Sequence, residues 1–320
     1  MISYMVKTMT FGQLRTFVVV ARRGSVTAAA AELFVTPPAI SAAVSALERE
    51  LGLALLEREG RGIRLTGAGQ AFAHYAAASL GLLEQGRDAA TFAERPGTGR
   101  LRVAAVMTAG EYVVPAILKG FRRTHPDVDV QLEVGNSALV IDRLLERRAD
   151  VGIGGRPPAE GSVEGRPFLD NRLIVVGAPD HPLAHRRAID PRRIDDVWLV
   201  REPGSGTAAA TQEFLSEHGV QPRAILHLGS NGAAKQAAAV GLGVTLISAQ
   251  AVSLELAAGT LAVIGTRATP IARRWFALSL TGELLPGAAR AFLEFVQTRT
   301  ARAEVGRASR APVTSAGPAR

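Results

Sequence analysis

A glycine- and serine-rich loop, Arg201 to Thr207, carries the residue types that point most directly to ligand chemistry. Its glycines let a ligand approach the backbone closely, and Ser205, Gly206 and Thr207 lead into an expected helix, where free N–H groups favour an anion. A plain N-capped helix after a glycine turn explains the same residues, and the sequence leaves both interpretations open. The loop is neither a Walker A loop nor a G-x-S-x-G elbow, so nucleotide hydrolysis and acyl transfer have no support.

An arginine lies in a second loop, which follows an expected strand. Arg156 precedes Pro157 and Pro158, and a rigid turn of this kind can aim its guanidinium into a cleft. There it would grip a phosphate or a carboxylate with two hydrogen bonds, whereas a solvated loop arginine is the alternative. Ten residues in these and similar loops are predicted to bind a small ligand: Thr108, Ala109, Asn136, Ser137, Arg156, Glu202, Ser205, Gly206, Thr207 and Asn231.

Two histidines, His181 and His185, lie beside Asp180 and suggest a metal site. Pro182 breaks the helix that would align them and no third ligand clusters nearby, so the sequence predicts loop histidines and no metal. The 320 residues include no cysteine, which excludes disulfides and thiol catalysis. Because no paired catalytic constellation is found either, the sequence predicts neither an enzyme nor a cofactor.

The stretch from Gly24 to Thr66 is predicted to form two short helices followed by a two-stranded hairpin. Ser25 is a good N-cap for the first helix. Thr36 can cap the second helix, with Pro37 at its first position, where no N–H is missed. One buried stripe recurs at helical spacing along the second helix: Ile40, Val44, Leu47 and Leu51.

The face opposite this stripe, together with the hairpin, is predicted to contact DNA. The helix spacing also fits an ordinary helical hairpin, but a basic two-stranded hairpin beside the second helix suits phosphate contacts along a groove. The predicted DNA-binding residues are Ser25, Thr27, Thr36, Pro37, Pro38, Ser41, Ala42, Ser45, Arg49, Arg58, Arg61 and Arg64.

A long helix is predicted to start after Thr66 and to run to about Arg95. Its small or apolar positions from Ala68 to Ala93 alternate in steps of four and three, which is a heptad seam. A seam this long favours a partner helix and hence a homodimer, whereas packing against the chain's own body is the alternative.

After a Pro-Gly linker, the pattern changes to alternating strands and helices, which predicts an α/β region with largely parallel sheets. The predicted domains are a winged helix-turn-helix of helical class at residues 1–66, a linker and dimerisation helix at 67–95, and an effector-binding domain at 99–300. Residues 301–320 consist mainly of Ala, Arg, Ser and Pro and are predicted to be a disordered tail.

Composition gives weaker information than the motifs. The formal net charge is +8, which suits a polyanionic partner. Residues 1–70 hold eight basic and five acidic side chains, so charge supports nucleic-acid binding only weakly. The sequence has no run of about 20 apolar residues and no apolar segment before a cleavage site, so it predicts a cytoplasmic protein without a transmembrane helix.

The motifs of the first 70 residues resemble the N-terminus of LysR-type transcriptional regulators. They read S-x-T-x-A-A-x-x-L, P-A-I-S-x-x-V-x-x-L-E-x-E-L-G, L-x-E-R and R-L-T-x-A-G. The resemblance runs from about Phe11 to Val296. It implies a dimerising linker helix and two α/β lobes resembling a periplasmic binding protein, with the effector in the cleft between them. Lobe I is expected at about 99–171 and 270–300, and lobe II at about 172–269.

The chain departs from this family on the face that is expected to read DNA. Members usually carry Gln at the place of Pro37 and Arg or Gln near Ala42. Without such side chains, base reading through bidentate hydrogen bonds loses support. Thr36, Ser41 and Ser45 are therefore expected to make short contacts and Ala42 methyl contacts, with more dependence on DNA shape.

Further motifs resemble the CO2-fixation regulators (CbbR type) within the LysR family. They include G-R-P-P, D-H-P-L-A, R-E-P-G-S-G-T and S-N-x-x-x-K-Q-A. This resemblance implies an activator of carbon-fixation genes that responds to an anionic, often phosphorylated, metabolite. Ala208 and Gly232 stand where an Arg and an acidic residue are common, and both departures could change the effector.

The sequence therefore predicts a cytoplasmic, homotetrameric regulator that binds promoter DNA and a small anionic metabolite, with RNA polymerase as a further partner. The effector is expected to favour one closure of the lobes, to repack a dimer of dimers and to alter DNA bending. The alternative is a solute-binding protein of a transport system, built on the same two-lobed fold. The winged module and the missing export signal count against that alternative.

Overall fold

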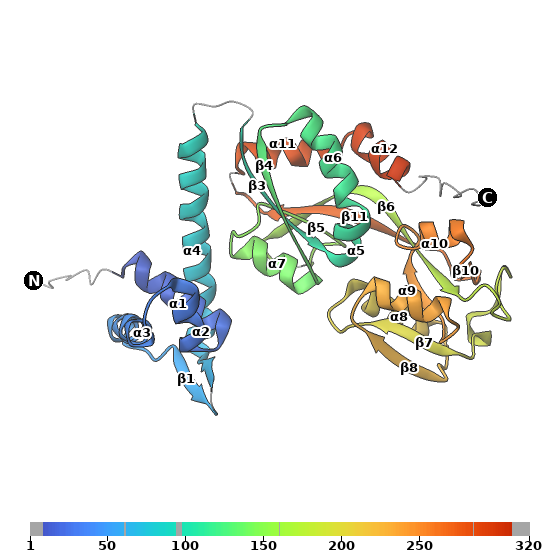
Figure 1. Cartoon of the computed structure of the whole chain (residues 1–320), viewed down its shortest axis with the longest axis horizontal. Coiled ribbons are helices and arrows are strands. Elements are labelled where there is room, and N and C mark those ends of the chain that lie inside the picture. The colour runs from blue at the N-terminus through green and yellow to red at the C-terminus, as the bar shows by residue number, and fades with distance from the viewer. Residues whose placement is uncertain (1–8, 61, 94–97, 160, 284, 309–320) are drawn as a thin grey trace, which may run out of the picture. The chain divides into compact units, whose positions relative to one another are not determined.

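The computed structural model describes residues 9–60, 62–93, 98–159, 161–283 and 285–308 (Figure 1). The chain divides into two compact units, and each is described by itself. The first unit holds the chain up to Ala93 with Leu145–Arg148, and the second holds Glu94–Leu144 and Ala149–Arg320.

The first unit begins with the predicted helices and hairpin. Its elements are α1 (Phe11–Arg23), α2 (Val26–Leu33), α3 (Pro37–Leu51), β1 (Leu56–Glu59), β2 (Gly62–Leu65) and α4 (Gly67–Phe92). The hydroxyls of Thr10, Ser25 and Thr66 start α1, α2 and α4 by accepting backbone N–H bonds of 3.2, 3.3 and 2.9 Å. Gly24 and Gly52 end α1 and α3 in the left-handed conformation. The two predicted short helices are thereby confirmed.

The start of α3 differs from the expectation in one respect. Thr36 occupies the N-cap position, but its side chain makes no capping hydrogen bond, so the prediction of a hydroxyl cap is wrong. Pro38 at the second helical position has no N–H to donate. The N–H of Ala39 donates to the backbone carbonyl of Thr36 instead, at 3.0 Å. The Thr36 hydroxyl therefore has no capping role.

The predicted stripe of α3 forms the centre of the first unit. Ile40, Val44 and Leu47 are buried, and Leu51 is half-buried. Ile40 and Val44 pack with Ala29 and Ala30 of α2, whose small side chains let the two helices approach closely. No single helix in the described ranges is long and apolar enough to cross a bilayer. The pair α2 and α3 passes on length and composition only when joined across a break bent by 105°.

Helix α4 is anchored at its N-terminal end. A Cβ atom at Gly69 would lie 2.0 Å from the carbonyl oxygen of Leu55, so only glycine permits this approach. The rings of Phe72 and Phe17 pack 5.6 Å apart. Further along the predicted heptad seam, Tyr75 and Leu82 are 72% and 53% exposed, so the described chain leaves this part of the seam uncovered.

The second unit contains a seven-stranded mixed sheet. Its strands are β3 (Gly99–Val106), β4 (Val128–Gly135), β5 (Val151–Gly154), β6 (Val163–Gly177), β9 (Thr245–Ser248), β10 (Ala262–Val263) and β11 (Ile271–Leu280). β4, β3 and β5 are parallel, but β11 is antiparallel to β5 and β6. The prediction of largely parallel sheets is therefore wrong here. The two long strands β6 and β11 carry the chain out of one lobe and back, so they must run in opposite directions (Figure 1).

Each lobe has its own hydrophobic core. Lobe I adds α5 (Met107–Tyr112), α6 (Val114–Thr124), α7 (Ser137–Leu145), α11 (Gly287–Val296) and α12 (Arg299–Ala308); lobe II adds η1 (Pro191–Arg193), β7 (Val197–Arg201), α8 (Gly206–Glu217), β8 (Ala224–Leu228), α9 (Asn231–Ala239) and α10 (Ser253–Ala258). Along β6, Phe168 belongs to the lobe I core and Leu173 to that of lobe II. Along β11, Ile271 packs on lobe II and Trp275 in lobe I. The lobes therefore meet within these two strands.

The expectation of a disordered tail from residue 301 is wrong for its first part. Arg299–Ala308 form α12, while residues 309–320 lie outside the described residues. Ala301 and Val305 are one helical turn apart and are buried in the lobe I core. Glu304, also buried, accepts a 2.8 Å hydrogen bond from Arg123 of α6. Composition suggested disorder, but this narrow apolar face is enough to dock the helix.

Truncating the apolar contact of α12 tests this packing. Val305→Ala should lower the free energy of unfolding by about 1–3 kcal/mol, because it removes buried methyl groups and leaves a cavity. Denaturant unfolding measures the change, and Arg302→Ala, at an exposed position of the same helix, is the matched control. Equal stability of both variants would show that α12 does not pack on lobe I.

Candidate effector site and DNA interface

A cavity of about 880 Å³ lies between the two lobes of the second unit. Loops at the carboxyl ends of β3, β4, β5 and β7 contribute to its wall, as expected for an open α/β sheet. Five arginines line it: Arg156, Arg172, Arg201, Arg273 and Arg274. The wall also holds Asp170, Glu202, Glu213 and Glu217, so the useful charge depends on which arginines are already paired.

Eight of the ten residues predicted to bind an effector line this cavity: Thr108, Asn136, Ser137, Arg156, Glu202, Ser205, Gly206 and Thr207. The other two do not. Ala109 is buried in the core of lobe I. Asn231 has 0% exposure and lies in a hydrogen-bond cluster beside the cavity. Both lie in the first turn of a helix, where residues can point into the fold as well as into the cleft.

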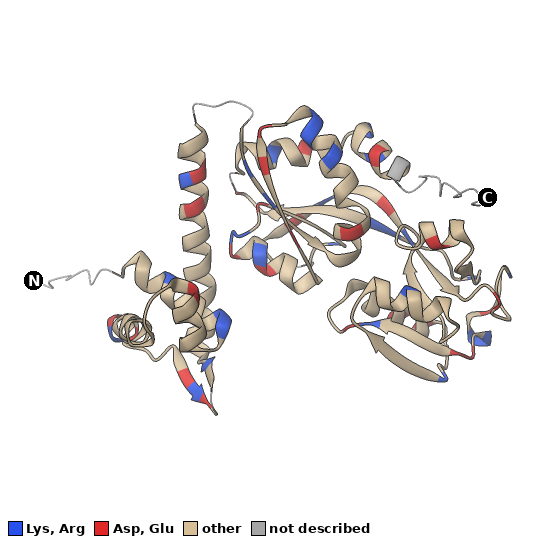
Figure 2. Cartoon of the chain, in the orientation of Figure 1, with Lys and Arg blue, Asp and Glu red and all other residues tan. Residues whose placement is uncertain are grey.

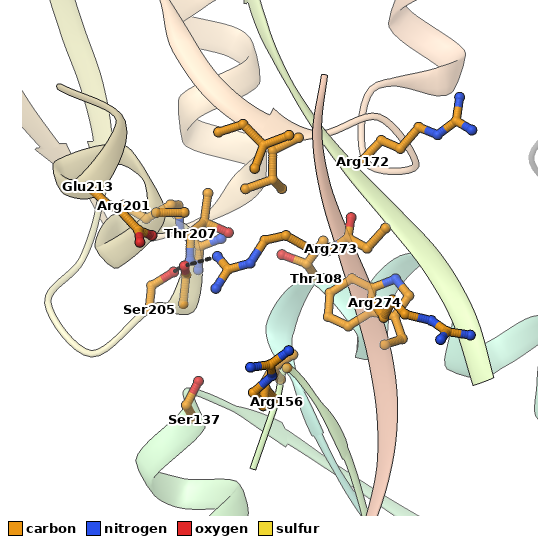
Figure 3. Close-up of a pocket in the computed structure, with 18 of the residues that line it drawn as sticks. Thr108, Ser137, Arg156, Arg172, Arg201, Ser205, Thr207, Glu213, Arg273 and Arg274 are labelled. Carbon is orange, nitrogen blue, oxygen red and sulfur yellow. Dashed lines mark hydrogen bonds between the residues drawn. The ribbon is translucent and has the colours of Figure 1, made fainter. Parts of the chain in front are cut away.

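Two of the arginines are directed into the cavity. Figure 3 shows the side chains of Arg156 and Arg273 pointing into the same space, whereas those of Arg172 and Arg274 point away from it. Within the described chain, Arg156 has no hydrogen-bond or ion-pair partner. Arg273 donates to the carbonyl oxygen of Gly206, at the start of α8, at 3.2 Å. A guanidinium in this position can grip a carboxylate or a phosphate.

The start of α8 combines both interpretations of its glycine-serine loop. The Ser205 hydroxyl accepts the N–H of Thr207 at 3.2 Å, which is an N-cap. Gly204 adopts φ 84°, a conformation that glycine takes without strain. Ser205, Gly206 and Thr207 also line the cavity, so the positive end of the helix faces it. The same loop can therefore cap α8 and face a bound anion.

Arg201 is paired within the protein. It is 3% exposed and forms two hydrogen bonds with the carboxylate of Glu202, at 2.7 and 2.8 Å. It also donates to Asn231 Oδ1 and, at 3.2 Å, to the sulfur of Met107. Glu202 lines the cavity as predicted, but its carboxylate is occupied by Arg201, so this pair adds little net charge to the wall.

Sequence reasoning missed Arg273, the cation best placed beside the start of α8. The apolar pattern predicts a strand only from Phe276, whereas β11 starts at Ile271. The adjacent arginines Arg273 and Arg274 interrupt the apolar run that marks a strand, so periodicity gives no signal there. In the folded strand, Arg273 and Trp275 both line the cavity, and Trp275 also packs in the lobe I core.

The predicted DNA-reading face of α3 is exposed in the first unit. All of its predicted members are exposed: Thr36, Pro37, Pro38, Ser41, Ala42, Ser45 and Arg49. Arg49 folds back and donates to the carbonyl oxygen of Ser45 at 3.2 Å. In α2, Thr27 is exposed, whereas the hydroxyl of Ser25 is engaged as the N-cap. The face therefore presents mainly short hydroxyl and apolar side chains.

Several arginines of the first unit, among them Arg22, Arg23 and Arg64, are paired with acidic side chains. Arg64 of the hairpin lies 2.8 Å from Glu57 and 3.7 Å from Glu59, and Figure 2 shows both charge signs side by side there. Arg58 has no partner within the described residues, and Arg61 lies outside them. Less free positive charge is available for phosphates than the arginine count suggests.

Glu32 pairs with two arginines on the helical side of the same unit. Arg23 donates to its carboxylate at 2.6 Å, and Arg22 forms a second ion pair with it. The hydrogen bond from Arg23 and the charge of Arg22 hold the pKa of Glu32 below its ordinary value, against the opposing effect of desolvation. The group stays ionised at neutral pH, so it offsets part of the positive charge of α1.

The two loop histidines do not gather metal ligands. His181 Nε2 lies 2.9 Å from Asp196 Oδ2. His185 has a positive φ of 60° in its loop. Among the described residues, no group of three or more His, Cys, Asp or Glu side chains is placed to hold a metal ion.

Comparison with known proteins shows the same two parts. The LysR substrate binding domain family matches residues 94–301, and the bacterial regulatory helix-turn-helix family of LysR type matches residues 11–70. A RuBisCO operon transcriptional regulator of Acidithiobacillus ferrooxidans is 38% identical over 298 residues, which cover 93% of this chain and 96% of the relative.

Two solved structures have a similar fold, and each holds a different kind of ligand. The regulatory domain of Synechocystis CcmR, in complex with 2-PG, is 36% identical with a TM-score of 0.59, and the match covers 62% of this chain and 95% of that one. Full-length CbnR, complexed with its target DNA, is 25% identical with a TM-score of 0.64 over 90% of this chain and 99% of that one. These matches favour a regulator over a solute-binding protein of transport. The chain belongs to the LysR family of bacterial transcriptional regulators, and it resembles the regulators of CO2-fixation operons within that family.

Proposed function

We propose that the cavity binds a small anionic metabolite and that this binding retunes the affinity of the regulator for promoter DNA. The observation that carries the proposal is the pair Arg156 and Arg273, both directed into one cavity beside the positive end of α8 (Figure 3). A phosphate or carboxylate would meet two guanidinium groups and the N–H group of Gly206 there, at the start of α8. The 2-PG (2-phosphoglycolate) in the complex of the CcmR regulatory domain is an anion of this chemical kind.

An anion in this cavity would couple to the arrangement of the lobes. Arg156 follows β5 in lobe I, Thr207 belongs to α8 in lobe II, and Arg273 lies on β11, which joins the lobes. An anion that contacts all three binds one closure better than another and so shifts the population toward it. The free energy of that preference limits how far promoter binding can change.

The DNA-bound form would be an oligomer in the cytoplasm. The exposed heptad side chains Tyr75 and Leu82 of α4 support pairing with a second copy of this helix. Two such dimers would form a tetramer that contacts half-sites a whole number of DNA turns apart. In this arrangement the exposed face of α3 reads the major groove, the regulator activates carbon-fixation genes, and RNA polymerase is a further partner.

Removing one guanidinium tests the proposed effector site. Arg156→Gln should weaken binding of 2-phosphoglycolate by about 10- to 100-fold, because hydrogen bonds to charged groups are worth about 1.5–3 kcal/mol. Isothermal titration calorimetry measures the dissociation constant. Arg172→Gln is the matched control, because Arg172 lines the same cavity but points away from its centre. If both variants lose affinity equally, the general charge of the cavity and not a specific grip holds the ligand.

A further inference from the structure

Helix α5 directly follows a strand of lobe I in the sequence, but several of its side chains contact lobe II. Its residue Ala109 is buried in the lobe I core. Tyr112, one turn away, packs on a buried cluster of lobe II, and the ammonium group of Lys235 from α9 lies 5.0 Å from the centre of its ring. The helix is therefore held by the cores of both lobes at once.

A buried polar cluster strengthens this connection. Asn231, the first residue of α9, is fully buried, and its amide nitrogen donates to Thr108 Oγ1 at 3.2 Å and to Glu111 Oε2 at 3.0 Å. Its amide oxygen accepts from Arg201. Thr108 and Glu111 lie on α5, whereas Arg201 ends β7 of lobe II. Buried amides of this kind are costly to leave unsatisfied, so separation of α5 from lobe II would break several bonds together.

We infer that Asn231 is a positioning residue of the effector site: it ties α5 to lobe II, so that one edge of the cleft stays closed while the edge lined by Arg156 and α8 moves. The hydrogen bonds of Asn231 with Thr108, Glu111 and Arg201 are called the bridge below. This inference rests on the proposed function, because it takes the cavity beside the bridge as the effector site. Asn231 does not line that cavity, so its influence on a ligand must pass through Thr108, Arg201 and the spacing of the lobes.

The bridge limits the kind of motion that a ligand can cause. Because α5 is fixed to lobe II at its buried face, closure becomes a rotation about this contact and not a separation of whole lobes. The distance between the groups of lobe I and the start of α8 is then set by the bridge. A ligand with two anionic ends depends on that distance, whereas a ligand with one end does not.

A charge change at the bridge, with a rescuing partner, tests the inference. Asn231→Asp keeps an acceptor for Arg201 but places a carboxylate against that of Glu111, which should push α5 away. Glu111→Gln restores a donor toward the new carboxylate, so the double variant should re-form the bridge. Glu111 is exposed and does not line the cavity, which makes the single variant Glu111→Gln a suitable control.

Hydrogen exchange provides a measurement that needs no ligand. Amides of α5 should exchange at least about fivefold faster in Asn231→Asp than in the wild-type protein, and the double variant should return toward the wild-type rate. Amides of α11, in the lobe I core, should not change. Unchanged exchange in α5 would overturn the inference, and so would equal acceleration throughout both lobes, which would indicate general destabilisation.

Ligand binding provides the second measurement. Asn231→Asp should weaken the binding of 2-phosphoglycolate, which has a phosphate and a carboxylate, by about tenfold. The affinity for inorganic phosphate should change less than about twofold. Equal losses for both probes would contradict a positioning role. If the wild-type protein binds neither probe, the proposed effector class fails, whereas the exchange of α5 still decides whether the bridge exists.

Discussion

Ser41→Glu should abolish binding to the operator, with a dissociation constant raised by more than about 100-fold at any effector concentration. Ser41 lies exposed in the middle of the predicted reading face of α3, among short side chains. A carboxylate there would face the negative potential of the groove and the acceptor atoms on the base edges without a cation beside it.

Fluorescence anisotropy with labelled promoter DNA measures this loss. Gln70→Glu makes the same change in charge at an exposed position of α4 and should leave most of the affinity intact. Calorimetric binding of the effector to Ser41→Glu should equal that of the wild-type protein, because the cavity lies within the second unit. An unchanged operator affinity would remove α3 as the reading helix.

Glu202→Met should destabilise the second unit by about 3–5 kcal/mol, because it leaves the buried guanidinium of Arg201 without its counter-ion. For a domain of this size, the loss corresponds to a melting temperature lower by roughly 6–20 °C. The double variant Arg201→Met with Glu202→Met removes both charges and should recover a large part of that stability.

Thermal unfolding of the wild-type protein, both single variants and the double variant completes a double-mutant cycle. A double variant that is less stable than either single variant, by the sum of their losses, would show that the two side chains do not act as a pair. In that case Arg201 and Glu202 would not form a coupled ion pair.

Local signals in the sequence predicted the first unit closely. Ser25, Pro37 and Gly52 carry their information in their own backbone preferences, so the ends of α2 and α3 follow without tertiary structure. The exception, Thr36, also has a local cause, since Pro38 removes an N–H that its hydroxyl would accept. Such features depend on neighbours within one helical turn.

The site of the second unit depends on contacts between distant residues, and there the sequence was less informative. A loop glycine-serine motif indicated the start of α8, but nothing local showed that Glu202 and Asn231 would satisfy Arg201. Arg273 reaches the cavity only because β11 pairs with β6, which lies about a hundred residues earlier in the chain. Long-range pairing of this kind cannot be read from periodicity alone.

The measurement that tests the central claim most directly is promoter binding with and without a metabolite. Anisotropy titrations would use the DNA upstream of the protein's own start codon and of the neighbouring divergent gene, with a panel of phosphorylated and carboxylated metabolites. We predict tight, salt-sensitive binding that one anionic metabolite changes in the wild-type protein, and that Arg156→Gln needs about 10- to 100-fold more of this metabolite for the same change. A metabolite response at the wild-type concentration in Arg156→Gln, or promoter binding that no anion alters, would contradict the proposal that this cavity is the sensor.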